Sequence, residues 1–347
     1  MLSFQNVVTN KADFGTSSRI AAKDLSIPDI APDFPAVTSH QLTAEKLGRK
    51  LSGQPEALRV LDLNKSFRSG FLRRPIRGIS GVSFTVTRGE VFALLGHNGA
   101  GKTTTINCIL DLVPAEGGEV RIFDKPNTDI HSRAKVGYLP ERPYFFEHLS
   151  GRELLVFYAK LLNISTAQIK NQVDSILAKT KMTEAADRPL RKYSKGMLQR
   201  IGLAQSLLGD PDLLILDEPM SGLDPVGRRE VRHLLQELKA EGKTIILSSH
   251  IVPDMEMLAD RVGIMCEGRL VEVCDMVSLA NQSSYEIRIV DDSTNLGHRT
   301  ERVADVNVLG KKLEQLAQEG QKILAVETRR SGLEDLFMKV HNQRKTK

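Results

Sequence analysis

The feature that most constrains this chain is the run Gly-His-Asn-Gly-Ala-Gly-Lys-Thr at residues 96–103. An apolar strand, Val91–Leu95, is predicted to lead into this run, and a helix from about Lys102 is predicted to follow it. Glycines let backbone N–H groups curl around phosphate oxygens, and the N-terminus of the helix favours a bound anion. The pattern therefore predicts a binding site for a nucleoside triphosphate. The alternative, a chance glycine-rich turn, does not explain the strand and helix on the correct sides.

Within this phosphate loop, two side chains have predicted chemical roles. Lys102 is expected to reach the β- and γ-phosphates, and the Thr103 hydroxyl is expected to ligate Mg²⁺. The full set of predicted nucleotide contacts in the loop and the first helical turn is Gly96, Asn98, Gly99, Ala100, Gly101, Lys102, Thr103 and Thr104.

Two adjacent carboxylates follow the apolar run Leu213–Leu216. Open α/β sheets place their ligand chemistry at the carboxyl ends of buried strands. Asp217 is expected to hold Mg²⁺, and Glu218 is expected to polarise the attacking water as a general base. Alone, such an acidic strand end is usually a strand meeting solvent. Paired with the phosphate loop, it indicates nucleotide hydrolysis.

Short apolar strands alternate with helical stretches from residue 58 onward, which predicts an α/β fold with a largely parallel sheet. Together with the phosphate loop, this pattern indicates a fold of the P-loop NTPase type. The expected strands are 84–86, Val91–Leu95, Leu213–Leu216 and 244–247. Between about 148 and 192 the pattern becomes helical. Ser150 and Glu153 form a predicted capping box there, and residues 165–179 have helical spacing.

The same patterns predict three segments. Residues 1–56 form a loosely ordered N-terminal extension, with a helix over 43–51. Residues 57–280 form the ATPase domain, whose helical subdomain spans about 142–192. Residues 281–347 form a small C-terminal α+β domain with strands at 285–290 and 322–328. Two apolar helical faces are expected there, made by Leu309, Leu313 and Leu316 and by Leu333, Leu336, Phe337 and Val340.

Other motifs resemble those of the ABC ATPase family. The run Tyr-Ser-Lys-Gly-Met-Leu-Gln-Arg at 193–200 resembles the family signature, residues 221–225 resemble the D-loop, and residues 248–250 resemble the switch-histidine loop. Glu141 stands at the Q-loop position, and Phe67 stands where the family stacks an aromatic ring on adenine. The matches occur in family order over residues 58–279, about two-thirds of the chain.

The resemblance implies a mechanism in which two copies pair head to tail, with ATP and Mg²⁺ as cofactors. Each ATP would lie between the phosphate loop of one subunit and Ser194 and Gly196 of the other, and His250 would contact the γ-phosphate and the water held by Glu218. Because one chain carries both halves, a homodimer would hold two complete sites.

Three residues depart from the family pattern. Lys195 and Met197 replace a glycine and a glutamine in the signature, while Ser194 and Gly196 are kept. Glu141 replaces a glutamine, and its carboxylate remains a candidate ligand for Mg²⁺. Within the phosphate loop, His97 is interpreted as a spacer with an outward side chain rather than a catalyst.

The leading functional hypothesis is an ATP-hydrolysing subunit of an ABC transporter, and more narrowly of an exporter. The signature variant and the run Gly-Leu-Glu-Asp-Leu-Phe at 332–337 resemble subunits of type-2 exporters. No window reaches the roughly 18 to 20 apolar residues of a spanning helix, and no secretory signal is recognised. A separate membrane-spanning permease is therefore expected, with this subunit peripheral at the cytoplasmic face of the membrane. The cargo is not legible.

The rival hypothesis is a soluble ABC ATPase that remodels or regulates ribosomes or DNA. The net charge of +5 is mild for 347 residues, so no nucleic-acid partner is expected. Tandem ATPase domains, a long coiled coil and zinc-binding cysteine pairs, which such factors carry, are not found. A nucleotide kinase or GTPase would need the phosphate loop but neither a signature nor a D-loop.

Overall fold

A computed structural model describes residues 55–69, 74–280, 283–291, 297–303, 306–330 and 332–342. The predicted N-terminal extension lies outside the described residues except for its last two positions, and its predicted helix at 43–51 lies wholly outside them. The division into three domains stays a prediction.

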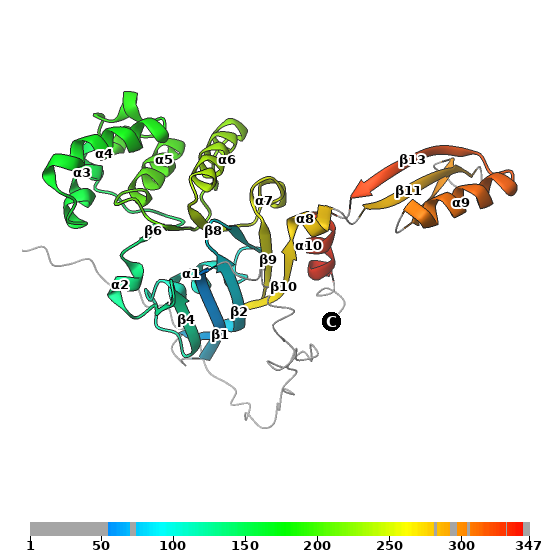
Figure 1. Ribbon diagram of the computed structural model, residues 1–347, viewed down its shortest axis with the longest axis horizontal. Coiled ribbons are helices and arrows are strands. Elements are labelled where there is room, and N and C mark those ends of the chain that lie inside the picture. The colour runs from blue at the N-terminus through cyan, green and yellow to red at the C-terminus, as the bar shows by residue number, and fades with distance from the viewer. Residues whose placement is uncertain are drawn as a thin grey trace, which may run out of the picture. The chain divides into compact units, whose positions relative to one another are not determined.

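A six-stranded sheet in the order β10-β9-β3-β8-β7-β6 forms the centre of the α/β fold (Figure 1). Its parallel strands are β3 (Val91–Leu95), β6 (Val136–Leu139), β7 (Leu213–Leu216), β8 (Thr244–Ser249) and β9 (Arg261–Cys266), while β10 (Arg269–Asp275) runs antiparallel to β9. Every residue of β3, β7 and β8 is buried, as expected for parallel strands covered on both faces. The bounds predicted for β3 and β7 are confirmed. The register pairs Leu95 with Ser249 and Leu216 with Leu247, so these three strands end at one edge.

A second, antiparallel sheet in the order β2-β1-β4-β5 was not predicted. Its strands are β1 (Glu56–Ser69), β2 (Arg74–Thr87), β4 (Gly117–Ile122) and β5 (Lys125–Pro126), so the strand expected at 84–86 is only the end of β2. Helix α1 (Lys102–Ile109) shares one apolar cluster with both sheets. In that cluster Phe84 of β2 stacks on Phe92 of β3, with ring centroids 4.9 Å apart. The second sheet therefore supports the helix that begins at the phosphate loop.

The predicted helical stretch is confirmed between β6 and β7. It contains α3 (Gly151–Leu161), α4 (Thr166–Lys179) and two short 3-10 turns (Thr183–Ala185 and Leu190–Lys192), while the short α2 (Ile130–Arg133) precedes β6. Helix α5 (Lys195–Ser206) lies beyond the predicted end of the stretch at about residue 192. The capping box is present, because Ser150 accepts from the Glu153 N–H and Glu153 accepts from the Ser150 N–H. Helices α6 (Pro225–Ala240) and α7 (Val252–Leu258) follow β7 and β8.

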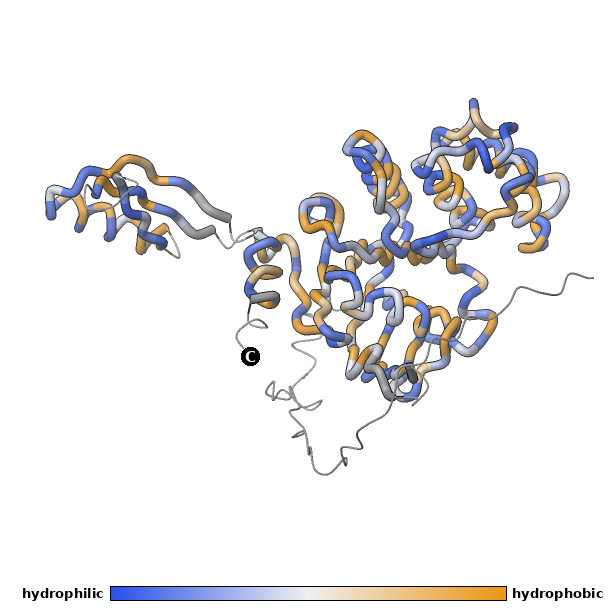
Figure 2. The backbone as a smooth tube through the Cα atoms, turned by 180° about the vertical axis from the view of Figure 1, so that it is seen from behind, coloured by the Kyte–Doolittle hydropathy of each residue, from blue (hydrophilic) through white to orange (hydrophobic). Residues whose placement is uncertain are grey.

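The C-terminal elements are α8 (Met276–Ala280), β11 (Ser283–Val290), β12 (His298–Val303), α9 (Val306–Gln318), β13 (Ile323–Arg330) and α10 (Leu333–Asn342). The antiparallel sheet β12-β11-β13 packs with the apolar face of α9 in a small cluster of its own. Figure 2 shows hydrophilic and hydrophobic residues alternating along α9. The apolar face of α10 instead belongs to the large cluster of the ATPase fold, where Leu333 and Phe337 are buried. None of the helices in the described part of the chain is long and apolar enough to span a membrane.

Candidate active site

The phosphate loop connects β3 to α1 through glycines that no other residue could replace without strain. Gly101 has φ 103°, in the left-handed region, and a Cβ added there would lie 2.9 Å from Cγ2 of Ile79. A Cβ on Gly96 would lie 2.7 Å from the carbonyl oxygen of Met265. Gly101 caps α1 without a side-chain hydrogen bond, so the first turn offers backbone N–H groups to an anion.

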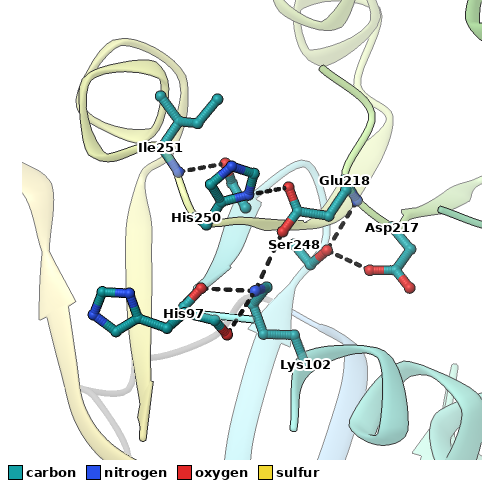
Figure 3. Close-up of polar contacts among 9 residues, drawn as sticks. His97, Lys102, Asp217, Glu218, Ser248, His250 and Ile251 are labelled. Carbon is teal, nitrogen blue, oxygen red and sulfur yellow. Dashed lines mark hydrogen bonds and ion pairs between the residues drawn. The ribbon is translucent and has the colours of Figure 1, made fainter. Parts of the chain in front are cut away.

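Lys102 is the best-held side chain of the loop, with only 5% of its surface exposed. Its ammonium donates to the carbonyl oxygens of Gly96 at 2.7 Å and His97 at 3.2 Å. It also lies 3.2 Å from Oε1 of Glu218, a charge contact that lacks hydrogen-bond geometry (Figure 3). The structure thus brings Lys102 and the predicted general base together.

Glu218 contacts His250 and Ser248 as well as Lys102. Its second oxygen, Oε2, lies 2.9 Å from Nδ1 of His250, and its N–H donates to the Ser248 hydroxyl at 2.9 Å (Figure 3). The carboxylate is buried, whereas 42% of the His250 side chain is exposed. A general base held between a cation and an imidazole can receive a proton from water and can be oriented while it does so.

The Glu218 backbone is held in the left-handed region at φ 51°. For a residue with a Cβ this conformation costs on the order of 1–2 kcal/mol. Strained backbone of this kind gathers at functional sites, where the surrounding structure enforces it. The strain is accompanied by the Ser248 hydrogen bond, which places the carboxylate at the end of β7.

Asp217 is fully buried and offers a free oxygen. Its Oδ1 accepts from the Ser248 hydroxyl, while Oδ2 has no hydrogen-bond partner in the part of the chain that the structure describes. Burial raises the pKa of the Asp217 carboxyl, the nearby hydroxyls of Ser248 and Thr103 lower it, and the charge of nearby Glu141 raises it further. An orphaned carboxylate oxygen beside a hydroxyl and a second carboxylate suits a hard cation such as Mg²⁺.

Comparison with known proteins decides the family. The ABC transporter family model matches residues 79–221. An ABC transporter ATP-binding protein of Nostoc sp. is 40% identical over 238 residues, which are 67% of this chain and 71% of that relative. This chain belongs to the ABC transporter ATP-binding family. The family predicted from the motifs is therefore confirmed.

Two further similarities extend this result. The fluoroquinolones export ATP-binding protein of Mycobacterium tuberculosis is 33% identical over 296 residues, covering 84% of this chain and 95% of that protein. The solved structure of an ATP-binding subunit of an ABC transporter is 31% identical, with a TM-score of 0.57, and the match covers 65% of this chain and 92% of that one. The predicted P-loop NTPase fold of the ABC type is confirmed.

The signature of this ABC ATPase does not join the phosphate loop within the chain. Ser194 caps α5 by accepting from the Met197 N–H at 3.2 Å, and it is exposed. Among the described residues, neither Ser194 nor Gly196 hydrogen-bonds to the phosphate loop. Leu223 of the D-loop packs beside Gly196 instead, 3.4 Å from the position of an added Cβ.

Phe67 of the ABC ATPase lies on β1 with 40% of its surface exposed. Its ring lies directly over Gly78, where an added Cβ would be 2.7 Å from Cε2. Lys65 places its ammonium 5.8 Å from the ring centroid. A partly exposed aromatic ring can stack on a base, and the assignment of adenine to Phe67 stays a prediction.

Sequence reasoning placed Ser248 in the switch loop without giving it a role. In the structure it is fully buried, accepts from the Glu218 N–H and donates to Asp217. Its place beside the two carboxylates follows from the pairing of β8 with β7, which the sequence alone does not indicate. The histidine of the phosphate loop, His97, also contacts Phe337 of α10, which the interpretation as an outward spacer did not foresee.

Ser248→Ala is expected to lower turnover about tenfold, because Asp217 and the Glu218 backbone would both lose a buried hydrogen bond. Loss of the hydroxyl also removes an influence that lowers the pKa of Asp217. Since the charged carboxylate is the form that binds a cation, the acid limb of the Mg²⁺-dependent activity should move to higher pH. Rate–pH profiles of the two proteins measure both effects. An unshifted acid limb would contradict this role for Ser248.

Proposed function

We propose that this protein is the ATP-hydrolysing subunit of an ABC exporter that acts through a separate membrane-spanning permease. The contact chain from Lys102 through Glu218 to His250 carries the proposal. It joins a phosphate-binding cation, a general base and an orienting imidazole at one sheet edge. Family membership supports ATP as the nucleotide, and the similarity to a fluoroquinolones export protein supports the export direction.

The proposed mechanism starts from the contacts of the Lys102 ammonium. Its ammonium lies 3.2 Å from a Glu218 oxygen and donates to two loop carbonyls. The phosphates of ATP would draw the ammonium toward themselves, because they carry more negative charge than one carboxylate. Glu218 would then be free to take a proton from water, while His250 keeps its Oε2 oriented toward the γ-phosphate. In this arrangement Glu218 would supply the base that hydrolysis requires.

The residues that would hold Mg²⁺ are Thr103, Asp217 and Glu141. The free Oδ2 of Asp217 supports this assignment, and Glu141 is near enough for its charge to act on the Asp217 carboxyl. Mg²⁺ held by these residues would supply positive charge that stabilises the phosphates of ATP. Asp217 is held in place because the surrounding residues bury its side chain.

A second copy of the chain would complete the site. Ser194 and Gly196 stand at the exposed N-terminus of α5, a position suited to a phosphate but not used by the phosphate loop of the same chain. We assign them to the ATP of a partner subunit in a head-to-tail homodimer. The remaining proposed ligands are those of the phosphate loop, with Phe67 at the base.

A groove beside the helical region is our proposed docking surface for the permease. Its volume is about 1110 Å³, and residues of β6, α3, α4 and α5 line it together with Pro140, the neighbour of Glu141 in sequence. Tyr144, Leu161 and Leu162 line it and are 93%, 61% and 54% exposed. Exposed apolar side chains around a groove mark a binding surface. A permease bound there would hold this subunit at the cytoplasmic face of the membrane, with direct access to the Q-loop position.

Co-purification tests the proposal. In the native host, the Glu218→Gln protein trapped with ATP and Mg²⁺ should retain a stoichiometric multi-spanning protein after gentle solubilisation. Adding Leu161→Glu should remove most of that partner, because a charge would be buried between Leu161's position and the permease, while leaving the ATP affinity of the isolated subunit unchanged. The matched control is Val277→Glu on α8, a residue that is 70% exposed and does not line the groove.

Each outcome is decisive. Recovery with ribosomes or DNA and without a membrane protein would replace the transport proposal by the soluble-factor alternative. Equal recovery of the permease with Leu161→Glu and with Val277→Glu would refute the groove as the docking surface.

A further inference from the structure

Helix α10 returns to the nucleotide site after the small sheet. The chain leaves the ATPase fold after α8, forms β11, β12, α9 and β13, and then places α10 against α7 and β9. Leu333 and Phe337, one helical turn apart, are 0% and 8% exposed within the large apolar cluster. Burial of this kind shows that α10 is a built part of the ATPase fold.

One contact of α10 reaches the phosphate loop. The ring of Phe337 lies 4.8 Å, centroid to centroid, from the imidazole of His97, at 39° to its plane. The carbonyl of the same His97 accepts from the Lys102 ammonium at 3.2 Å and from the Ala100 N–H at 3.0 Å. Phe337 therefore packs on the residue whose backbone holds the phosphate-binding lysine and the turn of the loop.

A second contact ties α10 to the other side of the site. Oε1 of Glu256 on α7 accepts from the Leu333 N–H at 2.8 Å, and so caps the start of α10. An added Cβ on Gly332 would lie 3.1 Å from that oxygen, so a small shift of the Glu256 carboxylate would admit it. Helix α7 begins at Val252, two residues after His250. Its Asp254 is paired with Arg232 of α6, which fixes α7 in turn.

We propose that Phe337 is a positioning residue for ATP, because its ring holds His97 and with it the carbonyls and N–H groups of the phosphate loop. The inference rests on the proposed function only in that the loop binds ATP. A loop held in its binding geometry loses less conformational freedom when the nucleotide arrives. The last helix of the C-terminal segment is thus part of the nucleotide site.

A double-mutant cycle tests this role in the full chain. Phe337→Leu keeps an apolar side chain in the core but loses the ring contact, and His97→Ala removes the other ring from an exposed position. In the Glu218→Gln background, each single change should weaken binding of fluorescent MANT-ATP with Mg²⁺ by about 2- to 10-fold, the range expected for one aromatic pair. The double variant should bind MANT-ATP with about the same affinity as the single variant that binds it more weakly, because both changes remove the same contact.

Further readouts separate positioning from simple packing. With Glu218 intact, Phe337→Leu should raise KM for ATP and leave kcat close to that of the parent protein. Phe337→Tyr should have a KM close to that of the parent protein. Met338→Ala, on the same helix and 46% exposed, is the matched control. Additive effects of the two changes, or a lowered Tm with unchanged MANT-ATP affinity, would overturn the inference. Failure of the parent protein itself to bind MANT-ATP would instead refute the proposed nucleotide site.

Discussion

Glu218→Gln is expected to retain ATP binding and to lower turnover on the order of 10² to 10⁴-fold, the contribution of a general base. Glutamine has nearly the shape of glutamate, so the positions facing Lys102 and His250 stay filled. Its amide does not accept a proton from water near neutral pH. Steady-state hydrolysis measured beside MANT-ATP affinity separates the two expectations.

The control for this prediction is the same chemical change outside the site. Glu184 is an exposed carboxylate in a 3-10 turn of the helical region. Glu184→Gln should hydrolyse ATP at the unchanged rate. If Glu218→Gln also hydrolyses ATP at a near-normal rate, Glu218 is not the base, and the polarising group must be sought elsewhere along the site.

Local signals explain why the centre of the site could be predicted from the sequence. The bounds of β3 and β7 and the start of α1 follow from short apolar runs next to glycines or carboxylates. The capping box that begins α3 depends only on Ser150 and Glu153. In each case the residues that determine the structure are neighbours in sequence, so the pattern contains the information.

Long-range pairing explains most of what the sequence did not reveal. The 14-residue strands β1 and β2 pair with register shifts, for example at Leu63 with Val82, and their apolar residues do not alternate regularly. The sheet order that puts β8 between β3 and β7 likewise depends on tertiary packing. Periodicity therefore indicated strands without indicating the second sheet.

Helix α10 shows the same limit at the site itself. The spacing of Leu333, Leu336, Phe337 and Val340 correctly predicted an apolar face. An apolar face alone does not identify the surface against which it packs, and proximity in sequence suggested that α10 would pack on the small C-terminal sheet. Tertiary packing places it instead on the ATPase core, where Phe337 meets His97 from a position 240 residues away.

Lys102→Ala is expected to weaken ATP binding about 10- to 100-fold, because a buried ammonium would no longer bond to the phosphates, and hydrogen bonds to charged groups contribute about 1.5–3 kcal/mol. The single substitution also leaves Glu218 buried without its cation, which costs about 3–5 kcal/mol of stability and could mimic a binding defect by unfolding the chain. The informative protein is therefore Lys102→Ala combined with Glu218→Gln, in which no carboxylate is left unpaired at that position. Its Tm should remain close to that of Glu218→Gln alone while its MANT-ATP affinity falls. Unchanged affinity in the folded double variant would show that Lys102 does not bind the phosphates.

Recovery of affinity on adding Glu218→Gln to Lys102→Ala would show that the single change acted through the unpaired carboxylate.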